Sequence, residues 1–216
     1  MSGPSSPARV APYGPADPFS LERDFESNPL MAAIKLARFK FVARMLSPDD
    51  VVADLGCGNG YGAYMYAHFA KAVIGVDLHA DLAAARARWR RDNLSFQEGD
   101  LARGLPEALA KAEVTTIVSV DVIEHLQKSD GEATIARCAA LLPPQGMLVL
   151  GTPSKFSEAY RSPGSRRDHL HEYEPEELRA LCARHFGRTL LFSMNDETVH
   201  TGFSKLAWFF FVLAFK

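Results

Sequence analysis

The chain has 216 residues, 47% of them apolar, which is enough to bury one substantial α/β core. Its formal net charge of −2 gives no general attraction to nucleic acid or anionic membranes, so neither is expected as a partner. Three cysteines without a C-x-x-C pair, and a start without a basic-then-apolar pattern, predict a reduced, cytoplasmic protein.

Residues 1–28 are predicted to form an irregular arm ahead of one domain over residues 29–216. Six of the 13 prolines fall in the first 29 residues, a composition that disfavours a packed element. A helix is predicted from Pro29 to Leu46, because apolar residues recur there at spacings of three and four. Its cations are interpreted as a solvated face, with a wall for an acidic substrate as the alternative; they are Lys35, Arg38, Lys40 and Arg44.

The segment VVADLGCGNGYGAYMYA, Val51 to Ala67, has the pattern of a strand, a tight turn and a helix. Glycines in the turn allow positive φ and let a ligand lie against the backbone, which the N–H groups of the new helix would face. The dinucleotide fingerprint needs a third glycine where Tyr61 stands, so a nicotinamide-dependent reductase is disfavoured. The strand ends in Asp54, whose carboxylate suits an amino or sulfonium group better than a phosphate.

After this segment, short apolar runs alternate with longer helical segments. Further strands are predicted at Ala72–Val76, Leu94–Gln97, Val114–Val120, Met147–Leu150, Arg188–Ser193 and Lys205–Phe215. Acids stand at positions 54, 77, 100 and 121, at intervals of 23, 23 and 21 residues, next to the ends of four strands. This spacing fits repeated strand–helix units in a parallel sheet, where ligands bind beyond the carboxyl ends of the strands. The apolar end of the chain is too short for a membrane helix, which needs ~20 residues.

The run D-L-G-C-G-N-G, Asp54 to Gly60, resembles the first motif of the class I S-adenosylmethionine-dependent methyltransferases. The resemblance extends roughly from Val51 to Phe215. It implies an α/β fold, a single-domain Rossmann-like seven-stranded mostly parallel sheet with helices on both faces and the last strand antiparallel. It also implies S-adenosyl-L-methionine as the cofactor.

The resemblance further implies roles for the strand-end acids. Asp54 would hold the amino group of the methionine moiety, Asp77 both ribose hydroxyls, and Asp100 the adenine amino group. A helix cap and ordinary turn aspartates are the alternative interpretations. The residues expected to bind the cofactor are Asp54, Gly56, Cys57, Gly58, Asn59, Gly60, Asp77, Leu78, Asp100, Leu101 and Asp121.

A second group, Asp121, Glu124 and His125, would share one side of a helix that begins near Asp121. The D-x-x-E-H pattern resembles the motif after the fourth strand of many small-molecule methyltransferases, which places it at the mouth of the site. Three interpretations stay open. His125 is a general base for a substrate hydroxyl, the three residues hold a divalent cation that lowers the hydroxyl pKa, or they form a capping network without chemistry.

The segment from Ser154 to Glu174 is predicted to be a long functional loop, followed by a helix over Pro175–Phe186. Within it, His169 and His171 would point to the same side of an extended chain. Either one would then join Asp121, Glu124 and His125 as a ligand of Mg²⁺, Mn²⁺ or Fe²⁺. Two surface histidines without a ligand are the alternative.

We therefore expect an enzyme that transfers a methyl group to a hydroxyl oxygen, or less readily a nitrogen, of a small molecule or sugar. The motifs T-P-S and H-x-H-E-Y-E-P-E-E-L resemble small-molecule and sugar O-methyltransferases. They also resemble metal-dependent RNA 2′-O-methyltransferases, which carry E-x-x-E-H. That alternative is weakened because Asp121 replaces the first glutamate and net positive charge is lacking. A cofactor-binding protein without catalysis is the third candidate. The sequence predicts neither the acceptor nor the oligomeric state.

Overall fold

The computed structural model describes residues 25–78 and 81–216. The irregular arm predicted for residues 1–28 therefore lies outside the described residues except for its last four, of which 25–27 are helical. The division into an arm and a domain stays a prediction.

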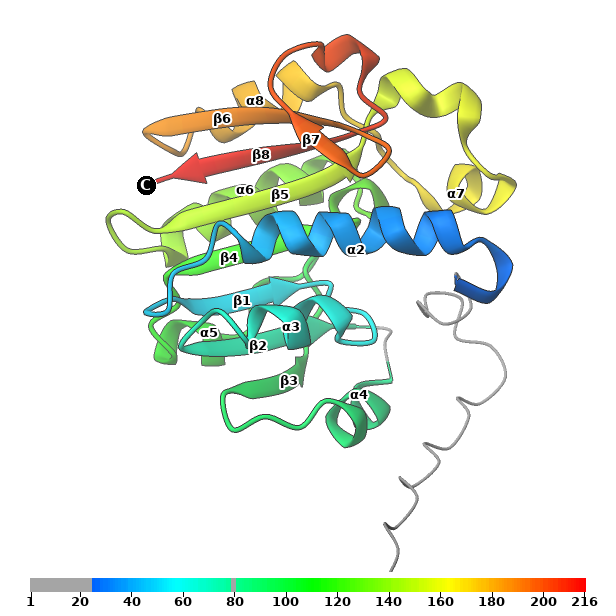
Figure 1. The fold of residues 1–216 in the computed structure, drawn as a ribbon. Helices are drawn as coiled ribbons and strands as arrows, with labels where there is room; N and C mark the ends of the chain where they lie inside the picture. The colour runs from blue at the N-terminus through cyan, green and yellow to red at the C-terminus, as the bar shows by residue number, and fades with distance from the viewer. Residues whose placement is uncertain (1–24, 79–80) are drawn as a thin grey trace, which may run out of the picture.

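Eight strands of the described part of the chain form the centre of the fold (Figure 1). They are β1 (Val51–Leu55), β2 (Ala72–Asp77), β3 (Leu94–Glu98), β4 (Thr116–Val120), β5 (Met147–Pro153), β6 (Arg188–Asn195), β7 (Thr198–His200) and β8 (Phe209–Phe215). They build one sheet in the order β3-β2-β1-β4-β5-β8-β6-β7. Strands β1 to β5 pair in parallel, and β8 inserts antiparallel between β5 and β6. The expected topology is confirmed, and β7 adds a short hairpin strand beside β6.

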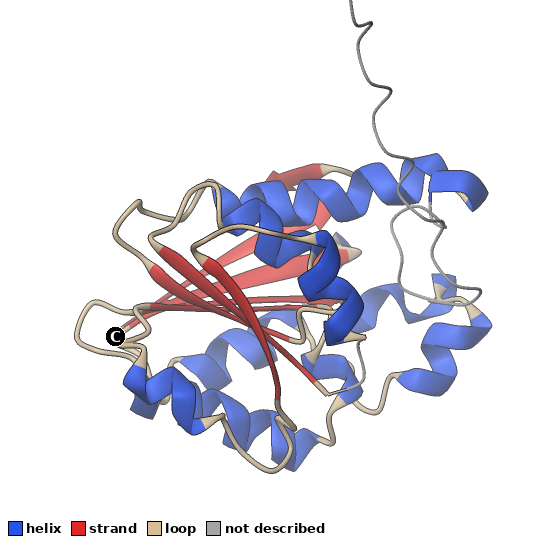
Figure 2. Ribbon diagram, turned by 90° about the horizontal axis from the view of Figure 1, so that it is seen from below, coloured by secondary structure: helices blue, strands red, loops and turns tan. Residues whose placement is uncertain are grey.

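Helices cover both faces of the sheet (Figure 2). The helices are α2 (Pro29–Ala43), α3 (Tyr61–Tyr66), α4 (Leu82–Arg88), α5 (Glu107–Lys111), α6 (Lys128–Leu141), α7 (Pro163–Asp168) and α8 (Pro175–Cys182). The described residues also form the 3₁₀ turns η1 (Ile123–His125), η2 (Lys155–Tyr160) and η3 (Ser204–Leu206). Buried side chains of α2, α3 and α4 pack on one face, and those of α5, α6 and α8 on the other.

The apolar run of β8 shows why the central strands lack an alternating pattern. Phe209 and Phe211 pack into the core under α2, while Phe210 and Val212 pack into the core under α6 and α8. A strand buried on both faces needs apolar residues at every position. Each such side chain contributes about 2 kcal/mol relative to an exposed one.

Two predicted elements differ from the structure. The region from Ser154 to Glu174 is not one irregular loop, because Ser154 and Ser162 each accept a hydrogen bond that caps a short helical turn, η2 and α7. The last strand begins at Phe209 rather than Lys205, since Phe203 has a left-handed φ of 53° and is followed by η3.

Candidate functional site

The carboxyl ends of β1, β2 and β4 meet at one edge of the sheet. Their register, in which Asp54 lies beside Gly75 and Val118, brings the acids that close these strands to this edge. In open parallel sheets, ligands bind in the crevice at this position.

The glycine turn after β1 is closely packed on one side and open on the other. A Cβ on Gly56 would lie 2.2 Å from Val122 Cγ2, and both Gly56 and Gly60 have positive φ. A Cβ on Gly58, in contrast, would meet no atom within 4 Å. The Gly58 N–H donates to Asp77 Oδ2 at 2.9 Å, so the turn and the end of β2 support each other. Gly58 is therefore the glycine of this turn whose backbone a ligand can approach.

Cys57 contributes its backbone to this turn rather than its thiol. Its N–H donates to Val76 O at 3.0 Å, while its side chain is buried against β2. Burial raises the thiol pKa far above its ordinary value, and the charges of Asp54 and Asp77 add to this. A nucleophilic role for this cysteine is therefore disfavoured.

Asp54 is a buried acid of the site, with 5% of its surface exposed. Burial raises its carboxyl pKa to about 7, and the charge of Asp77 adds to the effect. Nearby in the fold, Tyr66 Oη and Asn59 Nδ2 are buried without a hydrogen-bond partner among the described residues. A ligand with an amino group and polar oxygens would satisfy these three groups, so the site fits the methionine part of the expected cofactor.

The positions assigned to the adenine are less defined. Asp100 Oδ1 accepts from the Ala102 N–H at 3.0 Å and its other oxygen pairs with Arg103, as in an ordinary aspartate turn. Leu101 is buried, whereas Leu78 is 41% exposed. Contacts of these residues with an adenine stay a prediction.

Asp121 is part of the site edge but does not join the expected cation ligands. Both of its carboxylate oxygens accept from Arg38 Nη1, at 2.8 and 2.7 Å. The guanidinium also lies over the Phe209 ring, 3.9 Å from its centroid, and the side chain is 13% exposed. The interpretation of Arg38 as part of a solvated helix face was therefore wrong.

The helix predicted to begin near Asp121 is also absent. Asp121 has a left-handed φ of 58°, and only the 3₁₀ turn η1 follows before α6 begins at Lys128. This turn sends Glu124 into the core, where it is 1% exposed and its Oε2 accepts from Thr152 Oγ1 at 2.9 Å. Burial, with the charge of Asp121, raises the Glu124 pKa to about 8.

Glu124, His125 and His169 form a compact cluster, in which one potential ligand atom from each lies within 4.8 Å of the others. His125 Nδ1 is 3.0 Å from the backbone oxygen of Asp168; because a carbonyl only accepts, Nδ1 donates and Nε2 is free of its proton in the neutral ring. His169 Nδ1 lies 2.6 Å from Glu172 Oε1. Two oriented imidazoles and a buried carboxyl can accept a proton or bind a divalent cation.

Glu172 is an ionised acceptor for His169. Burial opposes its charge, but hydrogen bonds from Arg161 and His169 hold its carboxyl pKa below the ordinary value. A carboxylate accepts from His169 Nδ1, so in its neutral form that ring also presents an unprotonated Nε2. Glu172 thus orients the His169 ring, in the way that carboxylates often orient metal-binding histidines through the nitrogen that does not bind the metal.

His171 lies outside this cluster. Its ring packs edge-on against Tyr173 at 4.4 Å, and its Nε2 is 3.8 Å from Glu177 Oε1. The two histidines do not share a side because the chain bends at Leu170, where successive N–H groups donate to the Glu124 carbonyl at 2.7 and 3.1 Å. The potential metal ligands are therefore one carboxyl and two imidazoles. Because this set includes nitrogen atoms, it suits Mn²⁺ or Fe²⁺ better than a set of oxygen atoms alone would.

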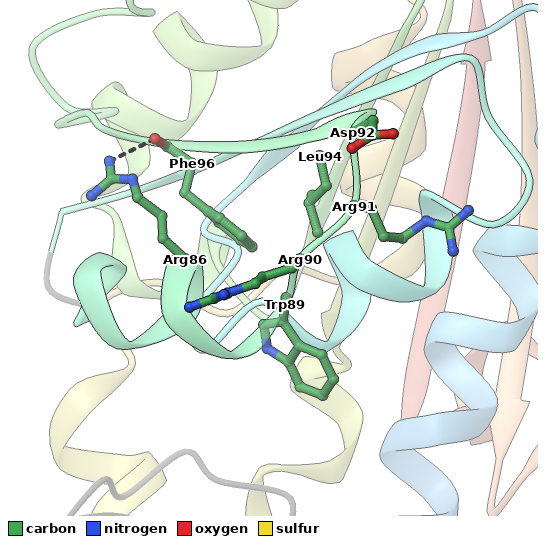
Figure 3. Close-up of a pocket in the computed structure, with 7 residues that line it drawn as sticks. All are labelled: Arg86, Trp89, Arg90, Arg91, Asp92, Leu94 and Phe96. Carbon is green, nitrogen blue, oxygen red and sulfur yellow. Dashed lines mark hydrogen bonds between the residues drawn. The ribbon is translucent and has the colours of Figure 1, made fainter. Parts of the chain in front are cut away.

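A pocket of about 330 Å³ opens away from these strand ends, between α4 and the beginning of β3 (Figure 3). It is lined by Arg86, Trp89, Arg90, Arg91, Asp92, Leu94 and Phe96. Arg86 donates to the Phe96 carbonyl at 2.6 Å, and the Trp89 indole to the Asn59 carbonyl at 2.7 Å. Trp89 and Phe96 thus pack against the glycine turn at Asn59 and Gly60, and we assign the pocket to the support of that turn.

Sequence reasoning missed Arg38, Thr152 and Trp89. Arg38 is one of four cations on one helix, and Thr152 stands in the T-P-S motif, which carries a family resemblance without giving this residue a role. A bulky aromatic such as Trp89 in an otherwise alanine- and arginine-rich segment was the available signal for a buried contact.

Comparison with known proteins identifies related chains. Residues 52–146 match a protein-family model described as a methyltransferase domain. A probable S-adenosylmethionine-dependent methyltransferase of Mycolicibacterium smegmatis is 36% identical over 146 residues, 67% of this chain and 52% of that protein. A ubiquinone biosynthesis O-methyltransferase of Rhodopseudomonas palustris is 30% identical over 100 residues, 46% of this chain and 38% of that protein.

The fold is shared with human N-acetylserotonin methyltransferase, solved in complex with S-adenosylmethionine, with a TM-score of 0.64 and 17% identity. The alignment covers 91% of this chain and 56% of that one. The chain spans about half the length of the first curated relatives it matches. Among the described helices, none is long and apolar enough to cross a membrane.

Proposed function

Because the chain belongs to the class I S-adenosylmethionine-dependent methyltransferases, we propose that it methylates a hydroxyl oxygen of a small molecule or sugar. The supporting observation is that a buried acid, Asp54, stands at the carboxyl end of β1, while Glu124 and His125, which cluster with His169, follow the end of the neighbouring strand β4. The carboxylate of Asp54 suits a cationic methyl donor, and the Glu124–His125–His169 cluster suits the removal of a proton from a methyl acceptor.

On the side of the methyl donor, Asp54 accepts hydrogen bonds from the amino group of the methionine moiety. A positive group at this position favours the charged carboxylate and offsets the burial that raises its pKa to about 7. Asp77 accepts hydrogen bonds from the ribose hydroxyls, while its Oδ2 also accepts one from the Gly58 N–H at 2.9 Å. The open side of Gly58 lets the donor lie against the turn.

On the acceptor side, the hydroxyl oxygen attacks the methyl carbon in line with the breaking carbon–sulfur bond. The new oxygen–carbon bond gives a methyl ether, and the electron pair of the broken bond leaves with S-adenosylhomocysteine. His125 Nε2 takes the hydroxyl proton, because its Nδ1 already donates to the Asp168 carbonyl. Most of the rate comes from aligning donor and acceptor and excluding water.

A divalent cation bound at Glu124, His125 and His169 would lower the pKa of the acceptor hydroxyl, and this is the second form of the proposal. It is supported by the buried Glu124 carboxyl and by the two imidazoles that are oriented through Nδ1. The RNA 2′-O-methyltransferase alternative is weakened, since Asp121, the counterpart of the first glutamate, is engaged by Arg38.

Calorimetric titration with S-adenosylmethionine, S-adenosylhomocysteine and a nicotinamide dinucleotide tests the donor assignment. Binding of the first two alone supports the proposal, and binding of the dinucleotide alone would reject it. Release of S-adenosylhomocysteine over a panel of phenols, catechols and sugars then tests catalysis. A protein that binds the donor but methylates no hydroxyl or amine would favour a binding function without catalysis.

A further inference from the structure

Five large apolar side chains lie exposed on or directly beside the turns η2 and η3, and we call this surface the apolar rim. Its members, with their exposed fractions, are Phe156 (43%), Tyr160 (85%), Phe203 (76%), Leu206 (67%) and Trp208 (54%). Single exposed apolar residues are ordinary, but a cluster of aromatic residues on two adjoining turns marks an interaction surface.

The rim is held in place by hydrogen bonds rather than exposed by chance. The Trp208 carbonyl accepts from the Ser154 N–H at 2.9 Å and from Ser157 Oγ at 3.0 Å, which joins the two turns. Asn195 Nδ2 donates to the Leu206 carbonyl at 3.0 Å. Phe203 keeps a left-handed φ of 53° with its ring outward, a conformation that is unfavourable for a bulky residue.

The rim continues outward from the acceptor side of the candidate site. Thr152, which donates a hydrogen bond to Glu124, is followed by Pro153 at the end of β5, and Phe156 of the rim lies three residues further along the chain. Trp208 directly precedes Phe209, whose ring lies under Arg38. Figure 1 shows both turns beside the carboxyl end of β5, at the edge of the sheet where the site lies.

The charges around the rim do not suit a polyanion. Lys155 lies 3.8 Å from Glu174, and Arg161 pairs with Glu172 at 2.7 Å. These two positive side chains are thus offset by carboxylates, and Lys205 of η3 is the further cation beside the rim for which no ion pair is found among the described residues. One such cation is less positive charge than a nucleic acid or an anionic membrane surface favours, so an uncharged apolar ligand suits the rim better.

We propose that the apolar rim binds the hydrocarbon part of a lipophilic acceptor whose hydroxyl lies at the Glu124–His125–His169 cluster. This inference rests on the proposed function and narrows its substrate class from small molecules and sugars to hydroxylated molecules with an apolar tail. Each tail carbon that moves from water onto the rim gains hydrophobic free energy, so affinity grows with tail length.

The test uses catechols with methyl, butyl and octyl tails, titrated calorimetrically into the full chain saturated with S-adenosylhomocysteine, which prevents turnover. We expect affinity to rise by about tenfold or more from methyl to octyl. The double variant Phe203→Ser/Trp208→Ser should lose this dependence and keep its affinity for S-adenosylhomocysteine. The control Phe69→Ser changes a residue that is 41% exposed in the turn before β2. It should keep both the dependence of affinity on tail length and the affinity for S-adenosylhomocysteine.

Three results would overturn the inference while leaving the donor assignment intact. The first is that the catechols bind with equal affinity whatever their tail, or that no catechol binds. The second is a dependence of affinity on tail length that survives in the double variant, and the third is self-association of the protein that the double variant abolishes. Binding to lipid vesicles that the double variant removes, with no tail dependence for the monomeric catechols, would assign the rim to a membrane surface instead. Failure to bind S-adenosylhomocysteine at all would reject the proposed function itself, which the tail series does not measure.

Discussion

Arg38 and Asp121, 83 positions apart in the chain, meet at the site edge, where one guanidinium nitrogen lies 2.8 and 2.7 Å from the two carboxylate oxygens. The contact joins the middle of α2 to the left-handed turn that ends β4. It fixes the helix over the site and keeps the Asp121 charge compensated beside the buried Glu124.

Replacing Arg38 by methionine should destabilise the protein, because Asp121 loses its partner in a half-buried position. The side chains are 13% and 35% exposed, so we expect a loss of about 1–3 kcal/mol in the free energy of unfolding rather than the larger cost of a fully buried pair. Urea unfolding at pH 7.5 measures it. Adding Asp121→Asn should recover part of the loss, and a double variant no more stable than Arg38→Met would show that the ion pair is not the cause.

A substitution at Asp77 should weaken donor binding without unfolding the chain. Asp77→Ala removes the acceptor of the Gly58 N–H and the proposed acceptor of the ribose hydroxyls, which should cost about 2 kcal/mol of binding free energy or more. The matched control is Asp81→Ala, because Asp81 Oδ1 caps α4 through the Ala84 N–H at 2.9 Å. It should lower stability by about 1 kcal/mol and leave the affinity for S-adenosylhomocysteine unchanged. Equal affinity of Asp77→Ala and wild type would remove Asp77 from the site.

The positions of the strands and the acids at their ends could be predicted, since strand periodicity and chain spacing are local properties of the sequence. The antiparallel insertion of the last strand followed from the family resemblance instead. The Glu124–His125–His169 cluster could be predicted only in part. Asp121 and His171 were assigned by assuming a helix and an extended strand, whereas a left-handed turn at Asp121 and a bend at Leu170 direct them elsewhere. Both departures depend on tertiary hydrogen bonds, such as those to the Glu124 carbonyl, which no local pattern encodes.

The glycines of the turn should respond differently to alanine. Gly56→Ala would place a methyl group 2.2 Å from Val122 Cγ2 at positive φ, and should cost several kcal/mol of stability, on the order of an overpacked core. Gly58→Ala meets no atom within 4 Å, so it should cost only about 1 kcal/mol of backbone strain. Its methyl group would nevertheless stand where the donor lies. Thermal unfolding of both variants measures the effect on stability, and titration with the methyl donor measures the effect on binding. A Gly58→Ala variant with full donor affinity would argue against binding at this turn.

Without ligands, the protein should become less stable as the pH rises from 5 to 8.5. The folded-state pKa of Glu124, about 8, lies above its ordinary value of 4.5, so the folded state binds the extra proton between these values. More protons bound in the folded state mean that stability falls with rising pH, by on the order of a few kcal/mol across the window. Asp54, at about 7, acts in the same direction.

Glu124→Gln should flatten this slope and make the protein more stable than wild type at pH 8.5. Glu176→Gln, on the exposed side of α8, is the control that should keep the wild-type slope. The comparison is made by urea unfolding at half-unit pH steps. A wild-type slope retained in Glu124→Gln would show that this carboxyl does not titrate in the window.

The last prediction decides whether a cation or a base activates the acceptor. If the cluster binds Mn²⁺, titration followed by electron paramagnetic resonance should show one site, weakened about 10-fold or more by Glu124→Gln or His169→Ala. His171→Ala should bind normally, because His171 packs against Tyr173 outside the cluster. Mn²⁺ should also reduce the pH slope of stability, since it favours the charged Glu124 carboxylate. Activity lost with EDTA and restored by Mn²⁺ or Mg²⁺ would complete the case. Full activity after exhaustive chelation, together with an inactive His125→Ala, would instead assign proton removal to His125 alone.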